Sequence, residues 1–515
     1  MMISSIKERL NLTNLIFILK GLAIGLITGV VVSLFRLAII YIFKLFIYFY
    51  HLINQNIWLL IPMVLLSFLM ALGIGTLMKR EPNIMGSGIP QVEGQLAGNL
   101  EMHWWSVLWR KFIGGALGIG SGLFLGREGP SIQLGAAVGQ GFAEMTKHTE
   151  SERRILIAGG GAAGLSAAFN APIASTLFIL EEVYHNFSPL IWTTALASSI
   201  SANYISLHFF GLKPALQMIN IQTLALSQYG HLIVLGLVLG LLGYLYQVVL
   251  LRATDLYNIL HRIPVFYRSI VPFILVIPIG LYLPQTLGGG NTIILSLVDN
   301  KALTVLLGLF LLRFIFSMIS YGSGLPGGIF LPILTLGAII GATYATSMTA
   351  LGILPAKYLT DFIIFGMAGY FAGIGKAPFT AILLITEMVG SLHHLMPLAI
   401  ISLVSFVVVD VLGGAPIYDS LLKKLIGQNE IDLGGKKDRL ETPIFAGSKL
   451  ENKKVLELDW PENSLLITVR RGEKQLIPHG ETILKAGDTL VLLTEHQNRA
   501  NLRTEMDALS GFESL

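Results

Sequence analysis

The chain of 515 residues contains no cysteine. This absence excludes disulfide bonds, thiolate metal sites and cysteine nucleophiles. Charged residues are also scarce: Asp, Glu, Lys and Arg make up 13% of the sequence, whereas soluble domains carry about 25%. Hydrophobic residues make up 53%, and the mean hydropathy is +0.70. The scarcity of charge therefore predicts an integral membrane protein.

The charge that is present is unevenly distributed. Of 66 charged residues, 26 lie after Glu430. The sequence thus divides into a membrane domain (residues 1–430), a linker (431–440) and a soluble domain (441–515). The small net charge of +4 fits cytoplasmic loops and membrane-edge lysines rather than nucleic-acid binding. The eleven histidines show no metal-ligand spacing, and no nucleophile and base pair up, so we expect neither a metal centre nor an enzyme.

The apolar segments predict an all-α polytopic fold of short, tilted and broken helices. A helix that spans a bilayer needs about 20 apolar residues. The run Leu15–Ile53 is longer than this and too long for a signal-peptide core, so it predicts a retained first helix. Later segments such as Pro172–Val183 and Pro378–Val389 are too short to cross alone. Irregular backbone at membrane depth survives only where protein or a cavity surrounds it.

The membrane domain contains an internal repeat. The longest matching segments agree at 10 of 20 positions. Ordered matches of this kind predict two related halves, about residues 15–210 and 230–412, with a substrate site between them. Three pairs of segments match, at offsets of 202, 202 and 206 positions: Gly120–Gly139 with Gly322–Gly341, Pro82–Gly88 with Pro284–Gly290, and Asn170–Glu181 with Lys376–Glu387.

Three glycine-rich breaks each precede a helical run: GSGIP (Gly86–Pro90), GREGP (Gly126–Pro130) and GGIFLP (Gly327–Pro332). A helix N-terminus carries roughly half a positive charge and unpaired N–H groups. Small residues let an anion approach these groups. Several converging termini would hold an anion weakly enough to release it, and the hydroxyl of Ser87 adds a donor. The alternative is that glycine and proline only permit bends and close packing.

Glu128 is the strongest single candidate for a functional residue. A carboxylate at membrane depth costs at least a few kcal/mol, so it tends to have a task. At a helix N-terminus, Glu128 would occupy the place of an anion when ionised and leave it when protonated. This behaviour is that of a proton-linked gate. The alternative is a salt bridge with Arg127 or Lys111.

Glu181 and Glu182 end the apolar run that starts at Pro172. Adjacent side chains point in different directions on a helix, so one carboxylate is expected to face the protein interior and the other solvent. The interior one would accept protons from one side of the membrane; the alternative is a solvated helix end. Tyr418 follows the last break, and its hydroxyl is either an anion donor or an interfacial anchor.

The three glycine-rich motifs and the late Tyr418 together resemble the CLC family of chloride channels and chloride/proton exchangers. The resemblance covers about Leu15 to Gln428. It implies a homodimer with a separate anion pathway in each subunit. It also implies about eighteen helices per subunit in two inverted halves.

The resemblance also assigns roles to individual residues. Ser87 and Tyr418 would offer hydroxyl groups to the anion, and the backbone N–H groups of Ile329 and Phe330 would complete the site. Glu128 would be the external gating glutamate. Glu182 ends a stretch similar to the family's FxxEE motif and would be the internal proton-transfer residue of an exchanger. Further residues that match positions in or near the family's motifs would support the site: Gly126, Arg127, Gly129, Pro130, Lys111 and Glu181.

The tail departs from the paired CBS domains of many CLC proteins. Four segments are similar instead to the TrkA-C (RCK-C) subdomain of potassium transport regulators, a small α+β unit: Lys453–Leu458, Leu466–Gly472, Ile477–Thr482 and Ala486–Leu490. By analogy the tail would be regulatory and would hold an unidentified small ligand. It also points to the cell membrane of a prokaryote, with the tail in the cytoplasm.

The leading hypothesis is therefore a chloride/proton antiporter, with bromide and nitrate tolerated and no cofactor. Glu182 favours exchange, because channels of the family commonly carry an apolar residue there. The alternative is a passive chloride channel with the same anion site, gated by voltage or pH. The expected partners of the protein are a second copy of the chain, chloride, protons and the lipid bilayer, and they do not include nucleic acid.

Overall fold

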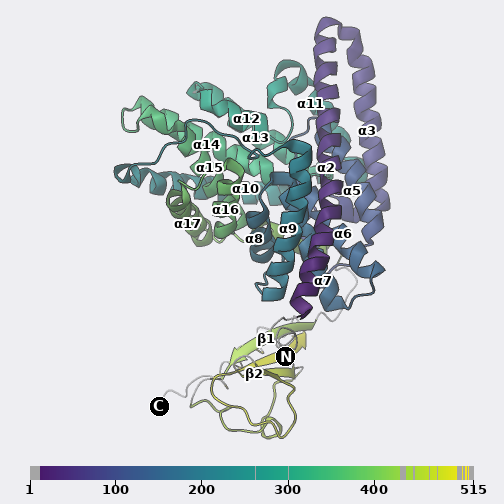
Figure 1. Cartoon of the computed structure of the whole chain (residues 1–515), viewed down its shortest axis with the longest axis vertical. Coiled ribbons are helices and arrows are strands. Elements are labelled where there is room, and N and C mark those ends of the chain that lie inside the picture. The colour runs from purple at the N-terminus through teal and green to yellow at the C-terminus, as the bar shows by residue number, and fades with distance from the viewer. Residues whose placement is uncertain are drawn as a thin grey trace, which may run out of the picture. The chain divides into compact units, whose positions relative to one another are not determined.

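A computed structural model describes most of the chain, and the chain divides between Leu425 and Ile426 into two compact units. The first unit is helical, and the second contains a β-sheet (Figure 1). The described residues are 12–260, 263–299, 301–429, 437–444, 447–462, 464–471 and 474–495, together with 502, 505, 506 and 509.

The first half of the membrane unit runs from α2 to α9, and the second from α10 to α17, followed by α18. Figure 1 shows α5, α6 and α7 on one side and α14, α15 and α17 on the other. The first-half helices are α2 Leu12–Gln55, α3 Leu60–Arg80, α4 Ile89–Ala97, α5 Trp104–Gly120, α6 Glu128–Met145, α7 Glu150–Phe169, α8 Pro172–Phe178 and α9 Pro189–Phe210. The others are α10 Gly230–Leu256, α11 Ile270–Tyr282, α12 Asn291–Ser296, α13 Leu303–Gly322, α14 Phe330–Ala350, α15 Leu359–Gly375, α16 Pro378–Val389, α17 Leu395–Val411 and α18 Ile417–Asn429.

The helices are uneven in length, as the sequence predicts. Within the described residues, seven helices are long and apolar enough to cross a membrane. The 44 residues of α2 rise about 66 Å, so this helix is longer than a bilayer is thick. By contrast, α8 has 7 residues and α16 has 12. Such short helices are stable at membrane depth because surrounding protein shields their ends.

Backbone hydrogen bonds between the halves follow the repeat. The N–H of Gly86 donates to the carbonyl of Gly324 (3.1 Å), and the N–H of Gly288 donates to the carbonyl of Gly122 (2.8 Å). Gly86 and Gly288 are related by the offset of 202, and so are Gly122 and Gly324. The same backbone hydrogen bond therefore joins the halves twice, and the half that donates in one bond accepts in the other. Two units around a pseudo-two-fold axis are expected to show this pattern.

Buried cations repeat in the same way. The ammonium of Lys111 donates to the carbonyls of Ile84 (2.9 Å) and Gly86 (2.8 Å). Arg313, 202 positions later, donates to the carbonyls of Thr286 (3.1 Å) and Gly288 (2.7 Å). Both cations are buried. They hold the turns that precede α4 and α12, because those carbonyls have no helical partner.

Glycines allow helices of one half to touch backbone to backbone. A side chain on Gly135 of α6 would collide with the carbonyl of Gly160 in α7, and one on Gly160 would collide with the carbonyl of Gly135. Gly337 of α14 and Gly366 of α15 meet in the same way in the second half. This close approach fixes α6 and α14, whose N-termini lie at the candidate site.

The described residues of the second unit form a four-stranded antiparallel sheet in the order β1-β4-β2-β3. Its buried residues, which include Val469, Leu490 and Leu492, form a core of their own. The strands are β1 Lys437–Pro443, β2 Ser464–Arg471, β3 Lys474–Leu476 and β4 Asp488–Glu495.

The sequence prediction for this sheet was partly wrong. From the sequence alone, short β-type runs predict strands at 464–470, 474–478, 489–494 and Val455–Leu458. The first three coincide with β2, the start of β3 and β4, but the fourth forms a 3-10 turn at Val455–Glu457. The strand β1 was not predicted, and it begins inside the segment taken as a linker. The predicted closing helix, Asn498–Leu509, falls largely outside the described residues.

An ion pair between the partly exposed Arg471 and the buried Asp488 joins β2 and β4. Asp488 accepts hydrogen bonds from Nε (2.8 Å) and Nη2 (2.7 Å) of Arg471 and from the N–H of Lys485 (2.9 Å). Burial alone would raise the pKa of Asp488, but these bonds and the nearby cations outweigh it and hold the pKa below its usual range. The stabilisation is therefore complete above the usual carboxyl pKa, about 4, and is lost as pH falls through the lowered value.

We expect Arg471→Gln to weaken the pairing of β2 with β4 at pH 7, because Asp488 stays buried without its cation. Amide hydrogen exchange of these strands in the full chain measures the effect, after correction for the intrinsic pH dependence of exchange. In the unmodified chain, protection should fall only below about pH 4. Equal protection of both proteins at pH 7 would contradict the assigned role.

Candidate functional site

The centre of the candidate site is the first turn of α6. This helix starts at Glu128, and the side chain of Glu128 is fully buried. Pro130 lies in the first turn, where its missing N–H costs no hydrogen bond. The sequence predicts a helical run after the GREGP motif; in the structure the helix begins within the motif, so Glu128 lies at the positive end of the helix.

The loops before α6 and α14 are joined at the repeat-related glycines. Gly126 and Gly328 exchange two backbone hydrogen bonds, each 2.7 Å long, in an isolated antiparallel bridge. A side chain on Gly126 would collide with the carboxylate of Glu128 and would lie 3.2 Å from the backbone nitrogen of Leu331. The Glu128 carboxylate therefore lies beside the start of α14 as well as at the start of α6.

The beginning of α14 supplies backbone donors to this region. Ile329 is its N-cap and Phe330 its first residue, and both are buried. The first N–H groups of a helix have no acceptor within the helix. These donors and the N-terminus of α6 thus meet at Glu128, as the repeat predicts.

Ser87 lies directly against α6. A side chain on Gly129 would collide with the hydroxyl of Ser87 and would come within 2.7 Å of its carbonyl oxygen. Glycine at 129 is therefore needed for this contact. Gly88, the N-cap of α4, has a φ of 95°, which a residue with a side chain rarely adopts. Lys111 fixes the same turn through the carbonyl of Gly86.

Tyr418, near the start of α18, reaches the site through an aromatic cluster. Its ring packs edge-on against Phe178 of α8 with centroids 6.1 Å apart, and Phe178 packs in the same way against Phe330 at 5.8 Å. The ring of Phe371 also packs against Phe330, with ring centroids 4.5 Å apart. Tyr418 is fully buried. The sequence alternative of an interfacial anchor does not agree with this burial.

Several polar atoms of the site have no partner among the described residues. They are the hydroxyls of Ser87 and Tyr418, both carboxylate oxygens of Glu128 and one oxygen of Glu182. A buried polar atom without a hydrogen bond costs about 1–3 kcal/mol. An arrangement of hydroxyl donors and helix N-termini around such atoms is suited to an anion with little hydration.

The cation nearest Glu128 does not neutralise it by close contact. Nε of Arg127 lies 4.0 Å from the carboxylate, at the limit of an ion pair. Lys111, the other partner considered from the sequence, donates instead to the carbonyls of Ile84 and Gly86. Of the two salt-bridge partners considered from the sequence, Arg127 is the one near the carboxylate, which also lies at the N-terminus of α6.

Glu182 lies in a π-helical turn, Ile179–Val183, that continues α8. Its side chain is 3% exposed, and the carboxylates of Glu93, Glu181 and Asp419 act on it electrostatically. Single π-turns inside helices are frequently found at functional sites. The solvated helix end considered from the sequence is therefore wrong for Glu182.

Glu181, its neighbour, has a structural role. Its carboxylate accepts hydrogen bonds from the N–H groups of Phe379 (3.3 Å) and Thr380 (2.8 Å) at the start of α16. Glu387, 206 positions later, accepts from the N–H groups of Ile173 (3.2 Å) and Ala174 (2.8 Å) at the start of α8. The two halves cap each other's helix reciprocally. Glu181 is partly exposed, whereas its neighbour Glu182 is buried.

We expect Glu181→Ala to lower stability by about 1–2 kcal/mol, since it removes a helix cap. Glu387→Ala should do the same, because it removes the symmetry-related cap. Thermal unfolding in detergent measures both effects. Proton transport should persist in each variant. Its loss in Glu181→Ala alone would contradict a purely structural role.

Sequence reasoning missed four residues at or near the site: Glu93, Arg313, Phe330 as part of an aromatic cluster, and Glu387. The offset of 202 applied to Lys111 leads to Arg313, and the offset of 206 applied to Glu181 leads to Glu387. Glu93 is 5% exposed in α4. A charged residue within this apolar run was the signal in the sequence that could have identified it. Within the described residues, no three His, Asp or Glu side chains are grouped to hold a metal ion.

Comparison with known proteins gives one consistent picture. Residues 69–410 match the family of the voltage gated chloride channel, and residues 441–507 match the TrkA-C domain. The H(+)/Cl(-) exchange transporter ClcA of Vibrio campbellii is 36% identical over 359 residues, which cover 68% of this chain and 76% of the relative. ClcA of Vibrio cholerae is 33% identical over 80% of this chain and 90% of the relative.

Solved structures agree with these relatives. A slow cyanobacterial Cl-/H+ antiporter superposes with a TM-score of 0.76 at 31% identity and covers 80% of this chain and 99% of its own. A CLC-type fluoride/proton antiporter superposes with a TM-score of 0.63 at 21% identity and covers 76% of this chain and 94% of its own. The second likeness concerns the fold alone.

Proposed function

The chain belongs to the voltage-gated chloride channel family, a family of transporters and channels rather than enzymes, and we propose on this basis that it exchanges chloride for protons. The observation that carries the proposal is the pair of buried carboxylates, Glu128 at the start of α6 and Glu182 in the π-turn after α8. Curated relatives named as H(+)/Cl(-) exchange transporters support it.

In the proposed mechanism, chloride binds between the hydroxyls of Ser87 and Tyr418 and the N–H groups of Ile329 and Phe330. Backbone and hydroxyl dipoles hold the anion without a full opposite charge, so it can leave again. Glu128 competes for the same helix N-termini while ionised. When it accepts a proton, its affinity for the positive end of the helices falls and chloride takes its place.

The proton taken up by Glu128 is then transferred to Glu182, which releases it on the other side of the membrane. Glu182 is buried beside other carboxylates, and a carboxyl group in such a place can accept a proton and pass it on. The passive channel remains the alternative, with Glu182 as an unused acid. The burial of Glu182 and its π-turn favour exchange.

The orientation follows from the basic residues. The last turn of α3 carries Lys79 and Arg80, the first turns of α7 carry Arg153 and Arg154, and α18 carries Lys423 and Lys424. Basic residues concentrate on the cytoplasmic side of membrane proteins. We therefore place these ends and the TrkA-C domain in the cytoplasm of a prokaryotic cell, where the domain would regulate transport.

We also propose a homodimer in which each subunit has its own pathway, because both halves of the candidate site come from one chain. Residues 1–430 form the transport domain in this proposal. Light scattering of the detergent-solubilised protein tests the oligomeric state, and a monomeric mass would contradict it.

The reversal potential of reconstituted protein under a combined chloride and pH gradient tests the exchange. An exchanger shifts its reversal potential with the proton gradient, whereas a pure channel follows chloride alone. A reversal potential that ignores pH would overturn the proposal in favour of the channel.

A further inference from the structure

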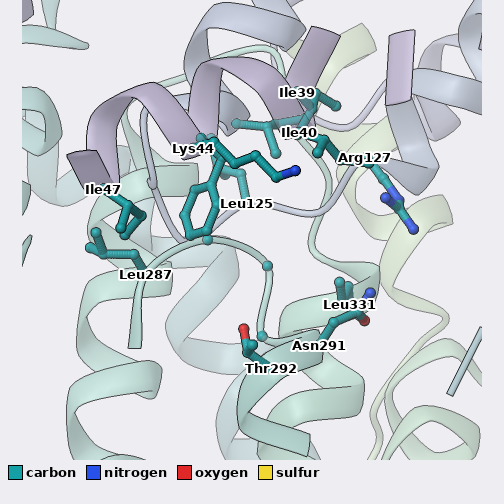
Figure 2. Close-up of a pocket in the computed structure, with 15 residues that line it drawn as sticks. Ile39, Ile40, Lys44, Ile47, Leu125, Arg127, Leu287, Asn291, Thr292 and Leu331 are labelled. Atoms are coloured by element: carbon teal, nitrogen blue, oxygen red, sulfur yellow. The ribbon is translucent and has the colours of Figure 1, made fainter. Parts of the chain in front are cut away.

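A pocket of about 470 Å³ lies next to the candidate site. One wall consists of residues of α2 (Ile39, Ile40, Phe43, Lys44 and Ile47), and the opposite side includes Leu287–Thr292 and Leu331 (Figure 2). A water molecule takes up roughly 30 Å³ in the liquid, so the pocket has room for a hydrated anion. Its floor reaches Leu331, whose backbone nitrogen lies beside the Glu128 carboxylate.

Both charged side chains that line this pocket are cations. Lys44 is exposed and Arg127 is 14% exposed, while most other lining residues are apolar. In Figure 2 the Lys44 side chain extends from α2, with its ammonium end directed toward the side on which Arg127 lies. Charges of one sign within low-dielectric walls focus the electric field and raise the local concentration of the opposite ion.

The position of Lys44 along α2 places it on the outer side. Lys20 of the same helix is close enough to Glu152, in the first turn of α7, to interact with it electrostatically. That end of α7 is cytoplasmic in the proposed orientation. The 24 residues from Lys20 to Lys44 rise about 36 Å, slightly more than the roughly 30 Å of the hydrocarbon core. Lys44 therefore lies at the level of the outer headgroups.

We propose that Lys44 concentrates external chloride in this pocket, which lies on the outer side of the anion pathway. The inference rests on the proposed function and goes beyond it by adding an access step. Chloride gathers near Lys44, passes Arg127 and reaches the N-termini of α6 and α14 when Glu128 is protonated. Lys44 acts on capture, so it affects the affinity for external chloride and leaves the maximal rate unchanged.

The absence of cysteine from the chain allows a direct test. In Lys44→Cys the only thiol lies at the pocket. Membrane-impermeant methanethiosulfonates then attach either a trimethylammonium or a sulfonate group to molecules whose outer side faces the reagent. The change in chloride uptake by the same liposomes when the reagent is added reports on those molecules alone.

At low ionic strength, we expect Lys44→Cys to raise the external chloride concentration at half-maximal uptake about threefold, because the pocket loses one positive charge that attracts chloride. The trimethylammonium group should restore the original value, and the sulfonate group should raise it further. Maximal rate and protons moved per chloride should stay the same. In ~0.5 M gluconate salt the differences should vanish, because the Debye length falls below about 5 Å.

Lys357→Cys is the matched control. Lys357 is an exposed lysine just before α15, and it does not line the pocket. Neither reagent should change half-saturating chloride in this variant. Equal half-saturating chloride in Lys44→Cys with either reagent would overturn the proposal and leave Lys44 as a lipid-facing anchor. Lack of proton coupling in the unmodified chain would instead overturn the proposed exchange, and the reagents would still decide the role of Lys44 in chloride access.

Discussion

Replacing Glu128 by glutamine is expected to stop proton transport while chloride transport continues. The carboxylate of Glu128 is fully buried at the start of α6. Glutamine keeps the shape but neither binds nor releases a proton near neutral pH. Proton flux should fall at least about 100-fold, the range seen when a positioned acid–base group is lost.

The chloride flux of Glu128→Gln should also lose its pH dependence. In the unmodified chain the anion displaces Glu128 only when that side chain is protonated, so acid should speed transport. A neutral side chain at 128 removes this competition at every pH. Chloride efflux from liposomes between pH 4.5 and 7.5 (about three decades of proton concentration) measures the effect. Glu387→Gln, which removes a carboxylate at a helix cap, is the control and should keep the pH dependence.

Glu182→Gln should also stop proton transport, but it should leave the pH dependence of chloride transport unchanged. Glu182 is buried in the π-turn after α8, next to Glu93 and Asp419. Without its carboxyl group the proton on Glu128 has no acceptor on the cytoplasmic side, so proton transport should again fall about 100-fold. Chloride transport should continue and should keep its response to pH, since Glu128 is intact.

The neighbour Glu181 gives the matched control for Glu182. Its carboxylate binds the N-terminus of α16. Glu181→Gln keeps a hydrogen-bond acceptor at the cap, so proton and chloride transport should both persist. Simultaneous measurement of chloride and proton flux in liposomes checks both variants. Proton transport of normal rate in Glu182→Gln would remove this residue from the pathway.

The sequence predicted the helical membrane fold, because glycine-rich motifs, apolar runs and an internal repeat all carry strong local signals. The predicted segment Pro378–Val389, for example, agrees with α16 at both ends. The roles of Glu181 and Glu182 were not separable, because adjacent residues of one run differ only in direction. The π-turn and the partner helix decide which carboxylate caps and which is buried.

In the tail, β1 was missed for a physical reason. Its sequence, KDRLETP, is polar, whereas sheet centres favour apolar and β-branched residues. Among the described strands, it pairs with β4 alone and lies at an edge of the sheet, where charged residues are common. Conversely, the apolar run at Val455 resembled a strand but forms a 3-10 turn. Short apolar runs do not distinguish these states without their partners.

The most direct test of the central claim is proton movement driven by chloride alone. Liposomes that contain the purified protein are given an outward chloride gradient at equal pH on both sides, and the external pH is recorded. We predict proton uptake that accompanies chloride efflux and that is absent in Glu128→Gln and in Glu182→Gln. Chloride efflux without proton uptake by the unmodified protein would contradict the account and identify a passive channel.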